Sequence, residues 1–494
     1  MIELLSPAEM AKADAATIAA GTPGIELMGR AGAAIARAAV AITSGPNLLV
    51  LAGPGNNGGD GFVAARLLRE QGYRVTVLLH GDRPALRGDA AEASRRFEGV
   101  VEPARPEALR GADLLIDALY GAGVRLPLDA DALRLVEAVN ASGMKVLAVD
   151  LPSGVEGAGG RIEGSAIRAD ATVTFFRLKP GHLLLPGREL CGPVEVADIG
   201  IDPKCLKSIA PKAFHNVPPL WQFAFPLARA EGHKYERGHL LVVSGPAGRT
   251  GAARLAAHAG LQIGAGLSTV ASPPDAVAEN AAQLTAVMVR PMDGAAGLAA
   301  LLEDARFNSV VLGPGLGIGE RTVDLVETAL ASRAAVVLDA DAITSYRDRP
   351  DRLFERIASR SAPTVLTPHD GEFARLFPDL ATDKLSRLYR ARQGAARSHA
   401  IVILKGADTV VVEPEGRAAI ADNAPPYLAT AGAGDVLSGI AGGLLAQGMK
   451  AFEGAAAAVW IHGEASRVHG PGLTAEDIDR SFPPVLAALE AGSP

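Results

Sequence analysis

The sequence is poor in cysteine, in aromatic residues and in long apolar runs. Its 494 residues include 2 cysteines, and aromatic side chains make up 4%. So few cysteines form no disulfide framework and no cysteine-based metal cluster, which is typical of a protein in a reducing cytoplasm. No apolar stretch reaches the roughly 18 residues of a bilayer-spanning helix, so we expect no membrane protein. The first residues lack a basic region followed by an apolar run, which predicts no secretory signal.

An excess of positive charge is also missing. Lys and Arg number 48 against 55 Asp and Glu, which gives a formal net charge of -7. Such a surface does not attract a nucleic-acid backbone or an anionic membrane. We therefore expect small-molecule substrates and, as the only macromolecular partner, further copies of the chain in a homo-oligomer.

What the chain does contain is the alternation of an α/β protein. Apolar residues make up 48% and charged residues 21%, as in ordinary globular proteins. Short runs of Val, Ile and Leu alternate with longer Ala-rich segments, which predicts parallel sheets covered by helices. The Ala-rich residues 7–42 predict one or two helices. The predicted strands are residues 48–53, 74–80, 113–119, 145–151, 171–176, 238–244, 267–271, 309–312, 335–339, 363–367, 400–405 and 409–413.

This alternation stops and starts again around residues 201–230. At about 100 to 200 residues per domain, the length predicts two or three domains. Residues 201–230 are rich in proline and show neither helical nor strand periodicity, so we interpret them as a connection. The prediction is two α/β domains, residues 1–210 and 231–494, joined by a linker at 211–230.

A glycine-rich segment follows the first predicted strand. Residues 53–61 read Gly-Pro-Gly-Asn-Asn-Gly-Gly-Asp-Gly and precede a predicted helix at 62–71. Backbone N–H groups at a helix N-terminus attract phosphate, and glycines allow a ligand to come close. Because the segment is not the usual G-x-G-x-x-G fingerprint, a plain turn is the alternative.

Two further predicted strands end in polar residues. Asp117 ends one of them, and Asp150 and Ser153 follow the next. The carboxyl ends of parallel strands meet at one crevice, which would bring these side chains towards Asn57. Their oxygens suit a hard cation such as K⁺ or Mg²⁺ better than zinc. The alternative is that each Asp caps the helix that follows it.

These motifs closely resemble the NAD(P)H-hydrate epimerase domain over about residues 1–210. The resemblance is carried by residues 55–61, 117–123 and 150–154, after Leu-Met-Gly-Arg-Ala-Gly at 27–32. It implies a Rossmann-like parallel-sheet domain in which Asn57, Asp117 and Ser153 hold K⁺. The implied substrate-binding residues are Asn56, Asn57, Gly58, Gly59, Asp60, Gly121, Ala122, Gly123, Val124, Arg125, Leu126, Pro127 and Asp150.

Two points about this domain stay open in the sequence. Either Asp117 or Asp150 is the catalytic acid or base of the implied epimerisation. The chain also departs from the family with Tyr120 and Ala122, where Phe and Thr are more usual. Loss of the Thr hydroxyl removes one group that could contact a phosphate or a cation.

The strongest single motif lies in the second half. Residues 429–439 read Ala-Thr-Ala-Gly-Ala-Gly-Asp-Val-Leu-Ser-Gly and precede a predicted helix at 440–447. Successive small residues at a helix N-terminus form an anion-binding concavity. Asp435 could there accept the proton of a hydroxyl that faces a phosphate. The alternative is a first-turn residue stabilised by the helix dipole.

Three other predicted strands of this half also end in candidate binding residues. They are followed by glycines at 313–317, by His369 and by Lys405. Glycines allow a flat ligand to approach, His369 offers a hydrogen bond, and Lys405 could neutralise a nucleotide phosphate. The alternatives are a turn, a turn histidine with satisfied hydrogen bonds and a solvated surface charge.

The motifs of the second half resemble the ADP-dependent NAD(P)H-hydrate dehydratase, which has a ribokinase-like fold. The resemblance covers about residues 230–490 and implies Mg²⁺ beside the nucleotide. It implies that Gly315 and His369 contact the hydrated dinucleotide and that the catalytic Asp435 contacts the departing hydroxyl. The implied ADP-binding residues are Lys405, Gly406, Ala407, Asp408, Thr409 and Gly434. One departure is Asp-Asn-Ala-Pro-Pro-Tyr-Leu at 422–428, where the family commonly has Gly-Asn-x-Gly-Met.

Together the two resemblances imply a bifunctional repair enzyme for nicotinamide cofactors. The first half would interconvert the R and S forms of hydrated NADH or NADPH, and the second would dehydrate the S form with ADP. A ribokinase-like small-molecule kinase is one alternative, because Gly434 and Asp435 suit any hydroxyl acceptor. In that case the first half would be a nucleotide-binding module without chemistry.

Overall fold

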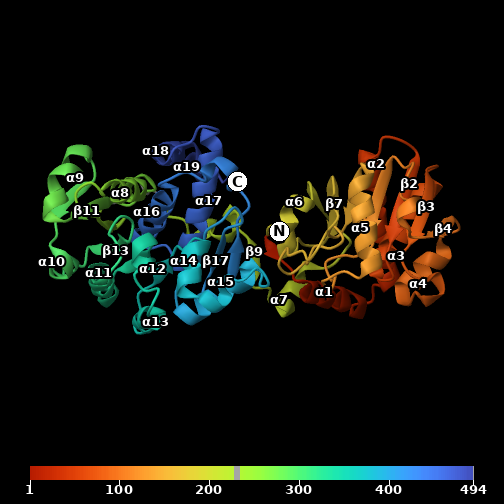
Figure 1. Ribbon diagram of the computed structural model, residues 1–494, viewed down its shortest axis with the longest axis horizontal. Helices are drawn as coiled ribbons and strands as arrows, with labels where there is room; N and C mark the ends of the chain where they lie inside the picture. The colour runs from red at the N-terminus through yellow and green to blue at the C-terminus, as the bar shows by residue number, and fades with distance from the viewer. Residues whose placement is uncertain (227–233, 493–494) are drawn as a thin grey trace. The chain divides into compact units, whose positions relative to one another are not determined.

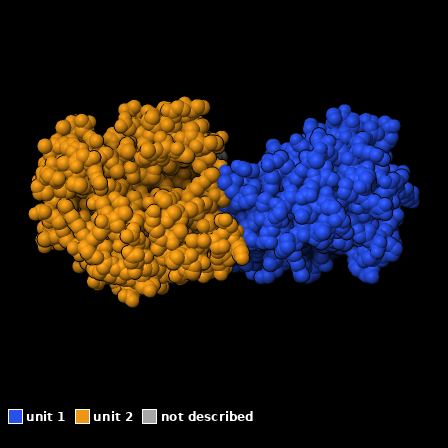
Figure 2. Space-filling view, in the orientation of Figure 1, with its two compact units in different colours: residues 1, 3–213 blue, residues 2, 214–494 orange. Residues whose placement is uncertain are grey.

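The computed structural model describes residues 1–226 and 234–492, which form two compact units (Figure 2). Unit 1 comprises residues 1 and 3–213, and unit 2 comprises residues 2 and 214–494. Both are α/β, so the predicted fold class is confirmed (Figure 1). None of the helices within the described residues is long and apolar enough to cross a membrane.

Unit 1 is built on a parallel sheet with the order β4-β3-β2-β5-β6-β7-β8. Val, Leu, Ile and Ala fill its central strands, whose residues are almost all buried, as expected for a sheet covered on both faces. Its strands are β2 (Asn47–Ala52), β3 (Arg74–Leu79), β4 (Val100–Pro103), β5 (Leu114–Ala118), β6 (Val146–Val149), β7 (Ala171–Phe175) and β8 (Val194–Ala197), and β1 (Glu3–Leu4) precedes them in the chain.

The helices of unit 1 cover both faces of this sheet. Residues of α1 to α4 share one apolar core with alternate residues of the strands, and α5 covers the opposite face. The Ala-rich residues 7–42 form two helices, α1 and α2. The bounds are α1 (Pro7–Ala19), α2 (Gly24–Ile42), α3 (Asn56–Glu70), α4 (Gly88–Arg96), α5 (Ala130–Ser142), α6 (Gly187–Leu190) and α7 (Leu206–Ile209).

Unit 2 has a larger, mixed sheet with the order β9-β18-β17-β16-β15-β14-β13-β10-β11-β12. The strands from β16 to β12 in this order are parallel, and β17 is antiparallel to both of its neighbours. The strands are β9 (Ala213–His215), β10 (His239–Val243), β11 (Leu267–Ser272), β12 (Met288–Pro291), β13 (Phe307–Leu312), β14 (Ala335–Leu338), β15 (Thr364–Leu366), β16 (Ile401–Leu404), β17 (Val410–Val412) and β18 (Ala418–Ile420).

Helices α8, α16 and α17 pack against one face of this sheet and form a continuous core with it. The Gly and Ala residues of α8 and α16 let these two helices pack closely, since a Cβ at Gly439 would lie 2.2 Å from the carbonyl oxygen of Ala256. The helices are α8 (Gly251–Gln262), α9 (Val277–Gln283), α10 (Gly294–Leu302), α11 (Glu320–Ala331), α12 (Ala340–Thr344), α13 (Pro350–Ala358), α14 (Asp370–Leu376), α15 (Arg387–Ser398), α16 (Ala433–Ala446), α17 (Ala451–His469), α18 (Ala475–Ile478) and α19 (Phe482–Glu490).

The strand predictions are confirmed, within one or two residues at most ends, by β2, β3, β5, β6, β7, β10, β11, β13, β14, β15, β16 and β17. The pattern missed short strands such as β4 and β12, whose residues are mostly exposed or half-buried. Edge strands of this kind lack the continuous apolar run by which the central strands are found.

The proline-rich connection is more ordered than its sequence suggests. Its described part contains α7 and β9, and the Trp221 side chain is 1% exposed within the core of unit 2. The indole N–H of Trp221 donates to the Asn216 side chain. Residues 227–230 of the predicted linker lie outside the described residues. Long-range packing of an aromatic ring therefore ordered a segment that has no local periodicity.

Candidate functional site

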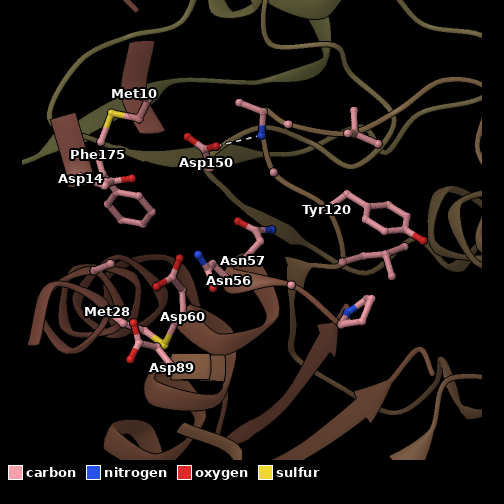
Figure 3. Close-up of a pocket in the computed structure, with 18 of the residues that line it drawn as sticks. Met10, Asp14, Met28, Asn56, Asn57, Asp60, Asp89, Tyr120, Asp150 and Phe175 are labelled. Carbon is pink, nitrogen blue, oxygen red and sulfur yellow. Dashed lines mark hydrogen bonds between the residues drawn. The ribbon is translucent and has the colours of Figure 1, made fainter. Parts of the chain in front are cut away.

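A cavity of about 770 Å³ opens in unit 1 beside the carboxyl ends of β2, β5 and β6. The strand order reverses between β2 and β5, and ligands of open α/β sheets bind at such a switch point. Helices α1, α2 and α3 complete its wall. Figure 3 shows Asp14, Asp60 and Asp150 around the space that Asn56 and Asn57 also border. The cavity therefore gathers carboxyl and amide groups within a lining that also contains apolar side chains such as Met28 and Phe175.

The Asn-Asn-Gly-Gly-Asp segment is part of α3 and is not a loop. Helix α3 begins at Asn56, so the predicted start at residue 62 was wrong. A Cβ at Gly58 would lie 1.9 Å from the Gly53 carbonyl oxygen, and one at Gly61 would lie 2.7 Å from the Ala118 Cβ. These glycines are required because the helix packs directly on the sheet, and this packing outweighs their low helix propensity.

Asp150 and Lys179 form a buried ion pair at the cavity. The Lys179 Nζ lies 2.7 Å from the Asp150 Oδ1, and the Lys179 side chain is 2% exposed. Thr174 donates its hydroxyl to the same carboxylate oxygen at 2.9 Å and accepts from Lys179 at 2.7 Å. Although burial disfavours the charged carboxylate, Lys179 lowers the pKa of Asp150 to about 2. Asp150 is therefore ionised at neutral pH.

The backbone around this pair is held by His182. Asp150 has a φ of 67°, an unusual value for a residue other than glycine. The His182 Nδ1 accepts from the Lys179 N–H at 2.9 Å, and its Nε2 lies 2.8 Å from the Asp150 carbonyl oxygen. Burial lowers the pKa of His182 to about 4, so the ring is neutral and donates from Nε2.

Asp117 is turned away from the cavity. Its Oδ1 accepts from the Ser153 hydroxyl at 2.6 Å, and its Oδ2 accepts from the Ser153 N–H at 2.8 Å. The Asp117 side chain is fully buried, and burial raises its pKa to about 6. Among the described residues neither Asp117 nor Asp150 is an N-cap, because the N-cap of α5 is Asp129 and that of α6, the α-helix that follows Asp150, is Pro186. The capping alternative is therefore wrong for both.

Asn57 has a buried amide group without a partner. Within the part of the chain that the structure describes, its Nδ2 makes no hydrogen bond and is shielded from solvent. Its Oδ1 would lie 3.0 Å from a Cβ built on Gly121, so glycine at this position leaves the amide uncovered. A buried polar atom without a partner is costly unless a ligand, ion or water completes it. Asn57 therefore indicates a binding position at the floor of the cavity.

Most of the predicted substrate-binding residues line the cavity. Its lining includes Asn56, Asn57, Asp60, Gly121, Ala122, Gly123, Val124, Arg125, Pro127 and Asp150. Gly58, Gly59 and Leu126 lie outside this lining. The Ala122 N–H donates to the Asp150 Oδ2 at 2.8 Å (Figure 3). Because this contact uses the backbone, it persists although the chain has Ala where Thr is more usual.

In unit 2, Asp435 lies in the first turn of α16. This helix begins at Ala433, so the predicted start at residue 440 was wrong. Its N-cap residue, Gly432, has a φ of 87°, which favours glycine. The run of small residues thus forms the helix N-terminus itself. The first-turn position that we considered for Asp435 is correct, and it does not exclude a catalytic role.

Lys405, at the end of β16, is directed towards this helix N-terminus. Its Nζ lies 2.8 Å from the Asp339 Oδ1 and 3.8 Å from the Glu372 Oε2. Although burial disfavours the charged amine, these carboxylates raise the pKa of Lys405. Its side chain is 19% exposed, so it is not a solvated surface charge. A Cβ at Gly434 would lie 3.3 Å from this Nζ, so glycine keeps the space above it open.

The environment of Asp435 disfavours its charge. Burial and the nearby Asp339 raise the pKa of Asp435 to about 7, with Glu372 acting in the same direction and Lys405 opposing them. A carboxyl group with this pKa can accept or release a proton near neutral pH. Asp435 therefore suits acid–base chemistry at the N-terminus of α16.

Residues 405–409 form a tight, braced turn. The Thr409 hydroxyl donates to the Gly406 carbonyl oxygen at 2.7 Å, and the Arg387 Nε lies 2.9 Å from the Asp408 Oδ1. Asp408 and Thr409 are buried, whereas Gly406 and Ala407 are exposed. The turn thus presents its backbone and keeps its acidic side chain paired. This arrangement suits an anionic ligand.

His369 and Gly315 have clear structural roles. His369 is the N-cap of α14, and its Nδ1 accepts from Gly371 and Glu372. Its Nδ1 is thus satisfied within its own turn, while its side chain is 55% exposed, so the contact of His369 with the substrate stays a prediction. Gly315 has a φ of 72°, and a Cβ there would lie 2.8 Å from the Arg249 carbonyl oxygen. His369 also pairs with Lys405 in a parallel β-bridge, which links two of the predicted positions.

Several residues of both sites were not predicted from the sequence. Lys179, Asp339, Glu372 and Arg387 were not singled out. Asp339 directly follows β14, so the strand-end argument used for Asp117 could have found it. Lys179 follows β7 in a Lys-Pro-Gly turn, which is a comparable signal. The sequence around Arg387 gives no sign of its role, because Arg387 lies on α15 and contacts the turn at residues 405–409 only in the folded chain.

Two family models match the chain. One, described as YjeF-related protein N-terminus, matches residues 24–181, and the other, described as NAD(P)H-hydrate dehydratase, matches residues 240–478. A solved ADP/ATP-dependent NAD(P)H-hydrate dehydratase from Bacillus subtilis, co-crystallized with ATP/Mg²⁺, is 24% identical with a TM-score of 0.49. The match covers 56% of this chain and 98% of that one.

Several relatives match nearly the whole chain, and each is named bifunctional NAD(P)H-hydrate repair enzyme Nnr. The one from Thermofilum pendens is 36% identical over 490 residues, 94% of this chain and 92% of its own. The one from Gloeobacter violaceus is 37% identical over 506 residues, 98% of each chain. The one from Escherichia coli is 34% identical over 456 residues, 90% of this chain and 85% of its own. The chain therefore belongs to the family of bifunctional NAD(P)H-hydrate repair enzymes.

Proposed function

We propose that the chain repairs hydrated NADH and NADPH with two separate active sites. Residues 1–210 would epimerise the R and S forms, and residues 231–494 would dehydrate the S form with ADP. The observation that carries the proposal is that each unit has its own polar site while relatives match almost the full chain. This observation disfavours the kinase alternative, in which the first unit would need no cavity with an ionised acid. A cytoplasmic location and a homo-oligomer stay predictions.

For epimerisation we assign Asp150, rather than Asp117, as the group that exchanges a proton with the substrate. Asp150 lines the cavity and is kept ionised by Lys179, so it can accept a proton there. Asp117 points both oxygens at Ser153 and is not among the lining residues. Residues 121–127 and Asn56 would border the dinucleotide, with the N-terminus of α3 near its phosphates.

For dehydration we assign Asp435 as the base that takes the proton of the C6 hydroxyl. The nucleotide would supply the phosphoryl group that turns this hydroxyl into a good leaving group. Lys405 and the backbone of residues 406–409 would hold its phosphates, and Gly434 keeps that space open. In the described residues no three His, Cys, Asp or Glu side chains are grouped to hold a metal ion. Mg²⁺ would then be bound mainly by the phosphates.

The residues at the end of β5 fit a potassium ion. The Ser153 hydroxyl lies within hydrogen-bond distance of both the Asp117 carboxylate and the Tyr120 carbonyl oxygen. The Nδ2 of Asn57 is buried and has no hydrogen-bond partner among the described residues, and exchange of the amide O and N positions would turn an oxygen towards the site. K⁺ there would supply positive charge beside the phosphates of the substrate.

A potassium ion at this position is testable by anomalous scattering. In crystals soaked with Rb⁺ or Tl⁺, we expect a peak among Asn57, Asp117 and Ser153, at contacts longer than those of Mg²⁺. Ser153→Ala should remove the peak, because the hydroxyl is a ligand, whereas Ser142→Ala on α5 should keep it. A peak that survives Ser153→Ala, or short octahedral contacts, would contradict the assignment.

The proposed function as a whole is tested with a mixture of the two hydrate epimers. With the full chain and ADP, we expect both epimers to return to the reduced cofactor, followed by the absorbance of reduced nicotinamide. Without nucleotide, pure R hydrate should equilibrate with S hydrate but give no reduced cofactor. Recovery that stops when the S form is exhausted would refute the epimerase assignment, and no recovery would refute the dehydratase assignment.

A further inference from the structure

Asp14 is a cavity residue to which neither the motifs nor the proposed mechanism gives a role. It lies on α1 and lines the cavity with Asp60, Asp150 and Lys179. Figure 3 shows its carboxyl group directed into the space that Asp60 and Asp150 border. Its side chain is half-buried and, within residues 1–226 and 234–492, makes no hydrogen bond or ion pair. A carboxyl group in this position is available to a ligand.

The pKa values of Asp14 and Asp150 are shifted in opposite directions. Burial raises the pKa of Asp14 to about 6, with Asp150 adding to the shift and Lys179 opposing it. Asp60 has its pKa raised by burial and by the charges of Asp150 and Asp14. Asp150, paired with Lys179, has its pKa lowered to about 2. Two acids whose environments separate their pKa values in one cavity can serve as donor and acceptor.

Within residues 1–226 and 234–492, no charged group on the elements packed against α1 forms a hydrogen bond or ion pair with Asp14. Helix α1 packs against α7 and against the short 3₁₀ helix η4 (Pro203–Cys205). The titratable residues on these elements and on α1 itself are Lys204, Cys205, Lys207, Glu9 and Lys12. The Glu9 carboxylate is bound to Ser6, Lys204 is 86% exposed beside Asp202, and the pKa of the Cys205 thiol is raised by burial. The ionisation of Asp14 is thus set by the cavity.

We propose that Asp14 is the proton donor of the epimerisation, acting across the cavity from Asp150. This inference rests on the proposed function and names a further catalytic residue for it. The O–H bond of Asp14 breaks and its proton joins the C6 hydroxyl oxygen. The C6–O bond then breaks, its electron pair leaves with water, and the lone pair of the ring nitrogen forms a double bond to C6.

Epimerisation is completed from the other face of the ring. A water molecule adds to C6 there, the electron pair of the C=N bond returns to nitrogen, and the water gives its proton to Asp150. In the reverse direction the two carboxyl groups exchange roles. Proton exchange with solvent then restores the starting form. No oxidant, reductant or further reactant is needed.

The test is the Asp14→Asn variant of the full chain, given pure R hydrate. After subtraction of the rate without enzyme, epimerisation should fall by about two to four powers of ten, because an amide donates no proton. Dehydration of S hydrate with ADP should be unchanged. Asp131→Asn, an exposed substitution on α5 outside the cavity, should epimerise like wild type.

Two further measurements separate catalysis from a structural role. Wild-type kcat/KM should fall as pH rises above about 6, where Asp14 loses its proton, and this limb should be absent in Asp14→Asn. A raised carboxyl pKa favours the folded state at low pH and destabilises it as pH rises through the folded value. Asp14→Asn should therefore keep or raise Tm at pH 8, whereas loss of a structural contact would lower it.

Isotope labelling tests the chemistry of the step. In H₂¹⁸O, epimerised hydrate should carry solvent oxygen at C6 when quenched early. The role of Asp14 would be overturned if the hydrate kept its original oxygen or if Asp14→Asn epimerised at the wild-type rate. It would also be overturned if kcat/KM of Asp14→Asn still fell with rising pH as in wild type. Absence of epimerisation in wild type would instead overturn the proposed function, so the two failures are distinguishable.

Discussion

Asp435→Asn should abolish dehydration and leave epimerisation intact. The substitution is nearly isosteric, but an amide cannot take the proton of the C6 hydroxyl, so dehydration should slow by about two to four powers of ten. Each unit has its own core, and the epimerase cavity is lined by residues of unit 1 alone. The measurements are recovery of cofactor from S hydrate with ADP and equilibration of pure R hydrate by chromatography.

The pH dependence of dehydration gives a second test of the role of Asp435. Because Asp435 must be ionised to act as a base, dehydration by wild type should rise with pH through about 7. A matched control is Asp351→Asn, since Asp351 is also a first-turn helix aspartate but is exposed on α13. It should dehydrate normally. Full dehydratase activity of Asp435→Asn would mean that Asp435 serves only the helix start, and loss of both activities in a folded protein would mean one shared site.

Lys179→Met should inactivate the epimerase and destabilise unit 1. Removal of one partner of a buried ion pair leaves the other charge uncompensated, which typically costs about 3–5 kcal/mol of folding free energy. The pKa of Asp150 is lowered in the folded state, so its stabilising contribution is present above the unfolded value and lost as pH falls through about 2. In the variant the pKa of Asp150 should rise, and the stability difference from wild type should shrink in acid.

Calorimetry of the full chain measures this effect, because the two units need not unfold together. Lys204→Met removes an amine that is 86% exposed and should leave stability and epimerisation unchanged. Adding Asp150→Asn to Lys179→Met should restore much of the lost stability but no epimerisation, because the uncompensated charge is gone. Wild-type stability in Lys179→Met would show that the pair contributes nothing to folding.

Much of the architecture followed from local patterns. Buried central strands such as β2, β5 and β13 are short apolar runs bounded by turn residues, and this signal needs no knowledge of the rest of the fold. Asn57 and Asp150 were also predicted to lie at one crevice, because parallel strands bring their carboxyl ends to the same edge, and both line the cavity. The motifs that carry the family resemblance lie at these ends.

The starts of two helices could not be read locally. The glycines of residues 58–61 and the small residues of 429–434 resemble loops, since glycine disfavours a helix. In the fold they form or adjoin the first turns of α3 and α16. At α3 the helix lies so close to the sheet that Gly58 and Gly61 have no room for a side chain, and at α16 the positive φ of Gly432 favours glycine. Tertiary structure therefore outweighed the low helix propensity of these glycines.

The sequence by itself determined two α/β domains, the strands of their centres and the segments that carry chemistry. Only the tertiary structure separated the surroundings of two similar aspartates, turning Asp117 inward to Ser153 and placing Asp150 at the cavity beside Lys179. It also brought Asp14 from α1 to the same cavity and Asp339 to Lys405. The physical reason is that ionisation and reactivity depend on burial and on neighbours far away in the chain, which a local pattern does not contain.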